Sequence, residues 1–380
     1  MLFIAVGWSV YGIHHRPFDL GLVGLAMFLP SLFLVFVTGH LVDKHDRKRI
    51  IVLAAIGQAV FTFTFAALAF AHIRDLVLYL AVLVGLGTAR AFGSPAERTI
   101  LVSIVDTSAY MSVQARYSSL REIVVIGAPA LGGWLVAISA AAAFSTAGVM
   151  VVAAVVGFSL VRVPASVRAK VAGFDTDSAL AGVRFIWARP IVLGAISLDL
   201  FAVLFGGAVA LLPIYADQIL HAGAVGYGLL RSASGVGASI MAIFLSGRTP
   251  NRRVGRTMFI AVAGFGLATI VFAFSRNLWL SIVALAACGA FDMVSVVIRR
   301  GLVQLNTPDT MRGRVNAVES VFIGASGQLG SFESGTVAQL IGPVACVAFG
   351  GVATVAIVVI WALAFPALRA SDQLRTSAEA

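Results

Sequence analysis

Residues 31–63 read SLFLVFVTGHLVDKHDRKRIIVLAAIGQAVFTF, and this stretch decides the fold. It joins two apolar runs, 20–42 and 50–71, through a short break that holds Lys44, Arg47, Lys48 and Arg49. Each run exceeds 20 residues, which is enough for an α-helix to cross a hydrocarbon core about 30 Å thick. The stretch therefore predicts two membrane-spanning helices joined by a tight, basic loop.

The composition of the whole chain agrees with this prediction. Of its 380 residues, 60% are hydrophobic and 12% charged, and the mean hydropathy is +0.99. An ordinary soluble domain has about 45–50% apolar and about 25% charged residues, so a water-soluble globule is excluded. A membrane β-barrel would show alternating ten-residue segments, whereas here the apolar runs are continuous. We therefore predict an all-α integral membrane protein.

Twelve apolar runs follow one another along the chain, and each is a predicted span. They are 1–13, 20–42, 50–71, 76–95, 118–138, 144–162, 190–212, 226–246, 257–274, 278–298, 316–341 and 344–366. The first run would cover only about 20 Å as a helix, so we expect it to be a truncated helix. A start codon set too far downstream is the favoured explanation, and a natural truncation is the alternative.

The basic residues indicate how the chain is oriented. If the 42–50 break lies in the cytoplasm, 22 of the 27 Lys and Arg residues fall on that side. This asymmetry follows the positive-inside rule and places both termini in the cytoplasm. The net charge of +10 is therefore a signal of orientation and does not indicate nucleic-acid binding.

The longest polar break lies halfway along the chain and separates six spans from six. We predict a six-helix bundle at 1–162 with a partial first helix, a cytoplasmic linker at 163–189, a second six-helix bundle at 190–366, and a cytoplasmic tail at 367–380. Apolar residues recur at helical spacing near 180–187, as in an amphipathic helix that lies on the inner leaflet. Basic breaks follow the second span of each half, which favours a transporter built from repeats.

The chain offers no pattern typical of an enzyme or a metalloprotein. Cys288 and Cys346 lie in separate apolar runs, without metal-ligand spacing. There is no Ser/His/Asp set and no Gly-rich phosphate loop. We therefore expect no catalytic residues, no metal and no cofactor.

The loop between the second and third spans resembles the signature loop of the major facilitator superfamily, Gly-x-Leu-x-Asp followed by basic residues. Its matching residues are Gly39, Asp43, Arg47, Lys48 and Arg49. Asp46 stands where the common pattern has Gly. The resemblance implies a twelve-helix bundle of two six-helix pseudo-repeats and a role for this loop in gating.

The fifth span holds Pro129, Gly132 and Gly133, which resemble a Gly-Pro-x-x-Gly-Gly element of facilitator-type exporters and antiporters. Proline kinks a helix, and paired glycines allow a neighbouring helix to approach closely. We expect a hinge here, although packing alone could also explain these residues.

The closest resemblance lies between residues 292 and 335, and it is to the enterobactin-exporter branch, which also contains macrolide-efflux-like permeases. The loop residues that carry it are Asp309, Arg312, Gly313 and Arg314. The resemblance covers nearly the whole chain and implies export. It does not identify the cargo, because these motifs serve gating.

Charged residues inside predicted spans are the candidate functional residues, because each costs about 2.5–3.5 kcal/mol at a span centre. Asp199 is the first candidate for proton coupling, since a carboxyl group removed from water can bind and release a proton. Glu333 and Asp292 are further candidates. The alternatives are fixed ion pairs, for example Asp199 with Arg90, or a latch between Asp292 and Arg299 seven residues on.

In the superfamily fold that the resemblance implies, spans 1, 4, 7 and 10 line a central cavity. Arg90, on span 4, is therefore a candidate cavity-lining residue. Trp8 and Tyr11, on the first span, are candidates for an aromatic wall, and an interfacial aromatic belt is the alternative.

Together these features predict a multi-pass exporter of the bacterial inner membrane that exchanges a small amphiphilic molecule for protons by alternating access. A catechol-type siderophore and a hydrophobic drug such as a macrolide are the two cargo hypotheses. The predicted partners are the small-molecule substrate, protons and the lipid bilayer, and we expect a monomer. The alternative is a transport-inactive truncated permease or membrane scaffold.

Overall fold

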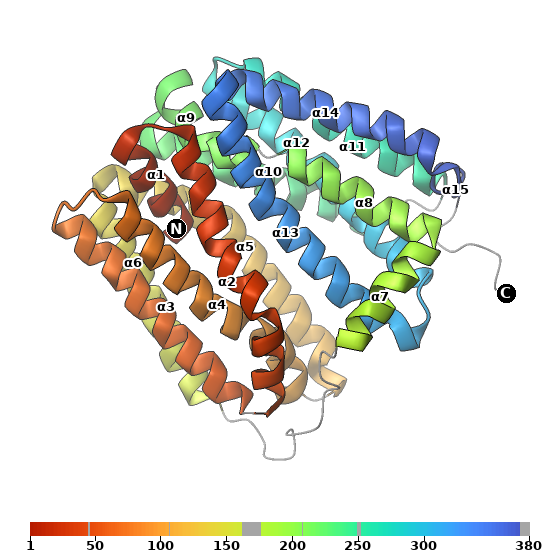
Figure 1. Ribbon diagram of the computed structural model, residues 1–380, viewed down its shortest axis with the longest axis horizontal. Coiled ribbons are helices and arrows are strands. Elements are labelled where there is room, and N and C mark those ends of the chain that lie inside the picture. Colours follow the sequence, from red (N-terminus) through yellow and green to blue (C-terminus); the bar gives the residue numbers. More distant parts are fainter. Residues whose placement is uncertain (45, 106, 162–175, 207, 249–251, 373–380) are drawn as a thin grey trace. The chain divides into compact units, whose positions relative to one another are not determined.

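The computed structural model describes residues 1–380 apart from 45, 106, 162–175, 207, 249–251 and 373–380. Some side chains within helices also lie outside the description: those of 35–37, 39–44, 47, 95–104, 107–108, 110–111 and 176–179. In the described part of the chain the regular structure is entirely helical (Figure 1). The prediction of an all-α protein is confirmed.

Ten helices among the described residues are long and apolar enough to cross a membrane. The N-terminal helix α1 (Leu2–His14) has 13 residues and is too short to be counted among them. The helix α13 (Asp309–Ile341) has 33 residues but carries Arg312, Arg314, Glu319 and Glu333, which lower its hydropathy. The multi-pass architecture is confirmed, and the count of twelve spans depends on how these two helices are assigned.

The first compact unit comprises Met1–Phe174 together with Gly223–Gly228. Besides α1 it contains α2 (Pro17–Lys44), α3 (Arg47–Phe70), α4 (Leu76–Ile104), α5 (Thr107–Ile138) and α6 (Ala140–Leu160). Within this unit, α3 packs against both α4 and α6, and α2 packs against α4. Phe65 of α3 and Phe144 of α6 are fully buried and stack with ring centroids 5.2 Å apart.

The second unit comprises Asp175–Ala222 and Leu229–Ala380. It contains α7 (Thr176–Ala188), α8 (Pro190–Phe205), η2 (Ala208–Leu211), α9 (Leu212–Ile214), η3 (Tyr215–Ile219), most of α10 (Gly223–Ser246), α11 (Val254–Phe274), α12 (Leu278–Leu305), α13, α14 (Pro343–Ala364) and α15 (Pro366–Arg369). Here α11 packs against both α12 and α14. A buried apolar cluster that includes Leu198, Met258 and Leu302 joins α8, α11 and α12.

The two units share a pattern of helix pairing and helix starts. The helix α3 packs on α4 and α6 in the first unit as α11 packs on α12 and α14 in the second. Side chains of the same kind cap α4 and α12: Asp75 accepts from the backbone N–H of Val77 and Leu78, and Asn277 accepts from the two equivalent N–H groups of α12. Such caps satisfy backbone donors that a helix cannot satisfy itself. The shared pattern supports an origin of the two halves as repeats.

The seventh predicted span, 190–212, is interrupted in the structure. The regular helix α8 ends at Phe205, and the chain continues through a 3₁₀ segment, a short helix containing Pro213, and a π-helical turn that ends at Ile219. Gly206 lies at the end of α8, where an added Cβ would come within 2.7 Å of the Phe265 ring. Discontinuous helices of this kind are common at the transport sites of membrane carriers.

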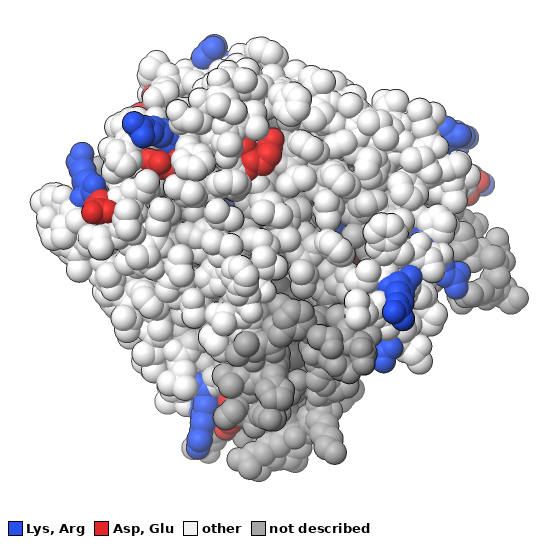
Figure 2. All heavy atoms as spheres, in the orientation of Figure 1, with Lys and Arg blue, Asp and Glu red and all other residues white. Residues whose placement is uncertain are grey.

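The outer faces of these helices suit a lipid environment. Phe33, Ile243 and Leu363 are each at least 70% exposed. On the face shown in Figure 2, most of the described side chains are uncharged, and Lys, Arg, Asp and Glu are few and scattered. In water such a surface would drive aggregation, whereas lipid tails solvate it.

The linker contains the predicted amphipathic helix as α7, which packs against α8 and α13 of the second unit. Its Ile186 is buried in a cluster with Val303 and Val315, while Leu180 and Trp187 are exposed. The helix is thus held on one side by the second unit, and its contact with the inner leaflet stays a prediction.

The predicted hinge in α5 coincides with a close helix contact inside the first unit. An added Cβ on Gly133 would lie 2.5 Å from the carbonyl oxygen of Ala224 and 2.8 Å from Cα of Gly228, both at the start of α10. An added Cβ on Gly228 would in turn lie 2.6 Å from the carbonyl oxygen of Pro129. Gly132 packs against Met1 and Ile4 of α1. Close packing is therefore observed, and movement at this contact stays a prediction.

We expect Gly133→Val to destabilise the protein by about 1–3 kcal/mol, because the contact between α5 and α10 has no room for a valine side chain and the backbones of both helices would be strained. Gly127→Val is the matched control, since it lies on the same helix and an added Cβ there meets nothing within 4 Å. Thermal unfolding of the purified proteins in detergent micelles measures the difference. Equal loss of thermal stability in both variants would contradict the proposed contact.

Candidate functional site: a buried ion cluster in the second unit

Three charged side chains meet inside the second unit. Nη1 of Arg299 lies 3.1 Å from Oδ2 of Asp199 and 3.2 Å from Oε1 of Glu319. The exposed fractions of Asp199, Arg299 and Glu319 are 5%, 3% and 8%. We call these three residues the ion cluster.

Each member comes from a different helix, and the local sequence explains its place. Asp199 lies nine residues after Pro190, about 13 Å along α8. Arg299 lies near the end of α12, and Glu319 lies about three turns into α13, which follows α12 after a short loop. Both α12 and α13 pack against α8, which carries Asp199. The three side chains can therefore meet although each comes from a different helix.

The ion cluster is held by charge rather than by well-aligned hydrogen bonds. Nε and Nη1 of Arg299 and Oε1 of Glu319 are buried and make no hydrogen bond to any residue that the structure describes. The guanidinium group thus lies between two carboxylates without being tightly bound to either. A change in the charge of one carboxylate would shift the group toward the other.

Asp292 brings a third carboxylate close to the cluster. It lies on α12, seven residues before Arg299, and thus on the same face of that helix. Among the described residues it forms no ion pair. With all groups ionised, Asp199, Asp292, Glu319 and Arg299 would carry a net charge of −2 in an apolar interior. Such a surplus is unfavourable unless a cation or a proton reduces it.

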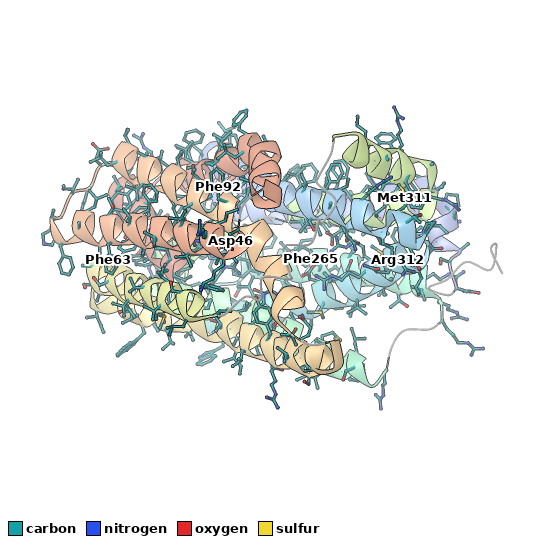
Figure 3. The ribbon with its side chains drawn as sticks, turned by 90° about the horizontal axis from the view of Figure 1, so that it is seen from below. Asp46, Phe63, Phe92, Phe265, Met311 and Arg312 are labelled. Atoms are coloured by element: carbon teal, nitrogen blue, oxygen red, sulfur yellow. The ribbon has the colours of Figure 1, made fainter. Side chains whose placement is uncertain are left out.

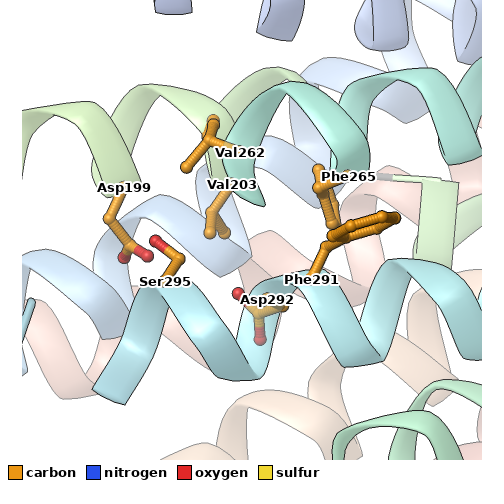
Figure 4. A pocket seen from close by; sticks show the side chains of 8 residues that line it. Asp199, Val203, Val262, Phe265, Phe291, Asp292 and Ser295 are labelled. Atoms are coloured by element: carbon orange, nitrogen blue, oxygen red, sulfur yellow. The ribbon is translucent and has the colours of Figure 1, made fainter. Parts of the chain in front are cut away.

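A cavity of about 20 Å³ adjoins the cluster between α8, α11 and α12. Its polar lining consists of Asp199, Asp292 and Ser295, while Val262 and Phe265 of α11 contribute apolar walls (Figure 4). Figure 4 shows the side chains of Asp199 and Ser295 reaching the cavity from facing helices. The site therefore combines fixed charge with enough space for a small polar species.

The structure revises the pairing expected for these residues. Asp199 pairs with Arg299 inside the second unit, while Arg90 belongs to the first unit. Arg299 pairs with Asp199 and Glu319, so the expected latch between Arg299 and Asp292 does not form. Seven residues place two side chains on one helix face but two turns apart, and residues on neighbouring helices are closer to Arg299.

Glu333, the remaining coupling candidate, lies apart from the cluster on α13. It is partly buried, and its Oε2 accepts a hydrogen bond of 3.3 Å from the hydroxyl of Ser334. Fourteen residues separate it from Glu319, which is about 21 Å along the helix. The structure therefore does not bring Glu333 together with Asp199 and Asp292.

The candidate cavity-lining residues all lie in the first unit. The guanidinium of Arg90 is positioned over the ring of Phe3, 5.0 Å from its centroid. Trp8 stacks on Tyr227 with centroids 6.2 Å apart, and Tyr11 is 2% exposed with its ring edge-on to His15. Tyr11 is therefore packed inside the first unit, and its place in an aromatic wall or an interfacial belt stays a prediction.

The signature loop between α2 and α3 is described only in part. The side chains of Gly39, Asp43 and Arg47 lie outside the described residues. Asp46, labelled in Figure 3, caps α3 by accepting from the backbone N–H of Lys48. Nζ of Lys48 donates to the carbonyl oxygen of Ser159 at the end of α6, at 2.7 Å, and Arg49 is exposed.

The second loop motif closes the turn between α12 and α13. Arg312, labelled in Figure 3, pairs with Asp309, and its Nε donates to the carbonyl oxygens of Gln304 in the last turn of α12 and of Thr307 just beyond it. These contacts satisfy backbone acceptors that the helix leaves open. Gly313 and Arg314 are exposed. The motif thus fixes the turn between the end of α12 and the start of α13, the helix that carries Glu319.

Two residues of the site were not among the sequence candidates. Neither Glu319 nor Ser295 was assigned a role from the sequence. An available signal for Glu319 was its charge inside an otherwise apolar predicted span. No local signal identified Ser295, because serine is common in membrane helices.

No group of three or more His, Cys, Asp or Glu side chains suited to a metal ion occurs among the described residues. Cys288 and Cys346 are both buried and unpaired with each other. The donor set at the ion cluster consists of carboxylates, one guanidinium and one hydroxyl. Such a set is suited to protons and small polar species.

Comparison with known proteins identifies the class. The family described as "Transmembrane secretion effector" matches residues 1–379. The chain therefore belongs to this family of major facilitator superfamily transporters. Its membership supports a transporter rather than an enzyme, and the alternative of a transport-inactive scaffold is not favoured.

Two characterised relatives are efflux proteins. The chain is 28% identical over 363 residues to the multidrug efflux pump Tap of Mycobacterium tuberculosis (strain ATCC 25618 / H37Rv), covering 89% of this chain and 83% of that protein. It is 26% identical over 378 residues to the enterobactin exporter EntS of Shigella dysenteriae serotype 1 (strain Sd197), covering 97% and 88%.

Solved structures share the fold at low sequence identity. A point mutant of the nucleoside transporter NupG superposes with a TM-score of 0.69 at 16% identity, covering 96% of this chain and 94% of that one. A bacterial homologue of the iron transporter ferroportin gives a TM-score of 0.65 at 15% identity, covering 97% of both chains. These likenesses establish the transporter fold.

We expect Arg299→Gln to destabilise the protein by about 3–5 kcal/mol, because it leaves buried carboxylates without their cation. Adding Asp199→Asn and Glu319→Gln should restore most of this loss by removing the unpaired charges. Arg256→Gln is the control, since Arg256 is exposed at the start of α11 and its loss should change stability by about 0.5 kcal/mol or less. Thermal unfolding in detergent is the measurement, and failure of the neutral triple variant to recover would contradict the charge argument.

Proposed function

We propose that this chain is a proton-coupled exporter of a small amphiphilic molecule in the bacterial inner membrane, working by alternating access. The observation that carries the proposal is the buried ion cluster on α8, α12 and α13, in a chain whose family relatives are efflux proteins. Ionisable groups within a membrane span are costly and typically belong to ion or proton pathways.

The geometry of the cluster suggests how a proton could be coupled to movement. When Asp199 is ionised, Arg299 is shared between Asp199 and Glu319. A proton on Asp199 removes its charge, so Arg299 would be attracted to Glu319 alone. Because each carboxylate is on a different helix, this change alters which helices are held together. Protonation of Asp199 would thereby weaken the link between α8 and α12 and strengthen the link between α12 and α13. A coupled conformational change requires such a shift in preference between two arrangements.

The free energy released when one proton crosses the membrane is enough to build a modest concentration gradient of the cargo. A membrane potential contributes about 2.3 kcal/mol per charge per 100 mV, and a pH gradient adds to it. One coupled proton at this potential supports a gradient of roughly fiftyfold, since about 1.4 kcal/mol is a factor of ten.

For the arrangement in the membrane, we propose twelve spans in two six-helix halves, with α1 and α13 as the two spans that hydropathy alone does not identify. The halves correspond to 1–162 and 190–366, joined by the linker 163–189, with a tail at 367–380. Both termini would lie in the cytoplasm, as the distribution of basic residues predicts. The loop motifs at 39–49 and 309–314 and the Pro129–Gly133 contact would serve gating and hinge movement, and the transporter would act as a monomer.

The cargo is proposed from two classes, a catechol-type siderophore and a hydrophobic drug such as a macrolide. The names of the two relatives point to these classes without separating them. We expect deletion of the gene either to lower secreted siderophore or to lower macrolide tolerance by severalfold, with restoration by the cloned gene. Siderophore in the culture medium and the growth-inhibitory concentration of erythromycin measure the two outcomes. No change in either would reject both cargo classes.

We expect Asp199→Asn to lower proton-driven accumulation in everted vesicles about tenfold, because the variant cannot exchange a proton at this position. The accumulated probe is radiolabelled enterobactin or erythromycin, whichever the deletion strain identifies, with and without a collapsed pH gradient. Downhill movement of the probe should persist. Asp75→Asn is the matched control, since Asp75 lies at the exposed start of α4 and Asn caps a helix equally well.

If Asp199→Asn keeps full dependence on the pH gradient, coupling through Asp199 is wrong. Loss of that dependence in Glu333→Gln instead would transfer the role to Glu333.

A further inference from the structure

The cavity beside the ion cluster has polar walls whose hydrogen-bonding capacity is not used within the described structure. Ser295 is 2% exposed, and its Oγ makes no hydrogen bond to any described residue. Serines within membrane helices usually donate back to the carbonyl four residues earlier, as Ser197 and Ser331 do here. Ser295 does not, so its hydroxyl remains for a partner in the cavity that it lines.

The remaining polar walls are acceptors. Asp199 uses Oδ2 to contact Arg299, and Asp292 has no ion pair among the described residues. An ionised carboxylate can only accept hydrogen bonds, whereas a hydroxyl both donates and accepts. A partner that satisfies all three groups must therefore donate twice and accept once.

The size of the cavity limits the partner to a single small species. Its volume of about 20 Å³ slightly exceeds the roughly 10–15 Å³ that one water molecule needs on the same measure. A buried water typically makes about three hydrogen bonds. Water can donate to Asp199 and to Asp292 and accept from Ser295, which matches the number and kind of groups present.

We propose that one water molecule binds in this cavity between Asp199, Asp292 and Ser295 and relays a proton between the two carboxyl groups. A sodium ion is the main alternative occupant, since it too would be coordinated by oxygen atoms. It fits less well, because the guanidinium of Arg299 lies 3.1 Å from Asp199 and repels a second cation there, whereas a neutral water is not repelled.

The relay moves one proton and leaves the water unchanged. When Asp292 is protonated, it donates to the water, which then accepts from Asp292 and Ser295 and donates to Asp199. The O–H bond of Asp292 breaks as its proton passes to the water oxygen. At the same time the water gives one of its own protons to a carboxylate oxygen of Asp199, where a new O–H bond forms. Asp199 is then neutral, and Arg299 is left to pair with Glu319.

The surrounding charges favour this position for a relay. The ionisable groups near the cavity are Asp199 on α8, Asp292 and Arg299 on α12, and Glu319 on α13. Arg300 follows on α12 and is exposed, and Cys288 lies one turn before Asp292. From α11 only the apolar Val262 and Phe265 line the cavity. The cavity is therefore polar only where Asp199, Asp292 and Ser295 line it, and a proton passing from Asp292 to the ion cluster would follow that side.

The water site is tested without any cargo, on the purified full-length protein in detergent. Infrared difference spectra between acid and neutral pH are recorded in ordinary water and in water labelled with oxygen-18. We expect an O–H stretching band of one ordered water that shifts with the label, and a carboxyl band that disappears in Asp292→Asn. Both bands should persist in Ser281→Ala, a control at another buried serine of the same helix.

Ser295→Val should remove the water band, because the larger apolar side chain fills the cavity and takes away the hydroxyl. Ser295→Ala should weaken the band and Ser295→Thr should retain it, so the result does not depend on one variant folding well. Absence of the labelled band in the wild-type protein would overturn the water site. Its loss on replacing choline chloride with sodium chloride would also overturn it and identify sodium as the occupant.

The role of the relay in transport rests on the proposed proton coupling, whereas the water site does not. In the vesicle assay with the identified probe, we expect Ser295→Val to lower proton-driven accumulation about tenfold and Ser295→Thr to restore it. If Asp199→Asn uncouples transport but Ser295→Val does not, the relay is wrong and the coupling stands. If neither variant affects coupling while the water band is present, the proposed function fails and the water site stands.

Discussion

A single guanidinium group, that of Arg299, lies between carboxylates in the apolar interior of the second unit, and the arrangement of α8, α12 and α13 depends on it. A buried charge without a partner costs several kcal/mol, so Asp199 and Glu319 can remain ionised there only because Arg299 is near. The same dependence makes the site sensitive to protons. Under the proposed coupling, adding or removing one proton would change whether the guanidinium on α12 holds α8 or α13.

Close approach between neighbouring helices stabilises the second unit around this cluster. Lipid provides no hydrophobic drive between helices, so association depends on packing and on small residues at contacts. Gly237 and Gly289 illustrate this between α10 and α12, where an added Cβ would lie 1.8 Å from a facing carbonyl oxygen. The interruption after Phe205 has a related effect, because it ends the regular helix two residues beyond Val203, which lines the cavity. Rigid packing and a broken helix thus lie side by side at the proposed coupling site.

Much of the fold could be predicted from hydrophobic runs, and the differences have clear causes. The spans predicted at 76–95 and 278–298 continue as α4 to Ile104 and as α12 to Leu305. These extensions are polar, so hydropathy did not include them, yet nothing in them stops a helix. The span at 316–341 lies within a helix that begins at Asp309. Helix ends depend on caps and turns, which hydropathy does not report.

The sequence by itself determined that the chain is an all-helical membrane protein, and its motifs indicated the superfamily, because the length and polarity of each segment are local properties. It also singled out Asp199 and Asp292 as costly charges. Only the tertiary structure decided that Arg299 pairs with Asp199 and Glu319, and that Ser295 shares a cavity with the two aspartates. Those contacts join residues on different helices, and their distances depend on how the helices pack, which no local pattern specifies.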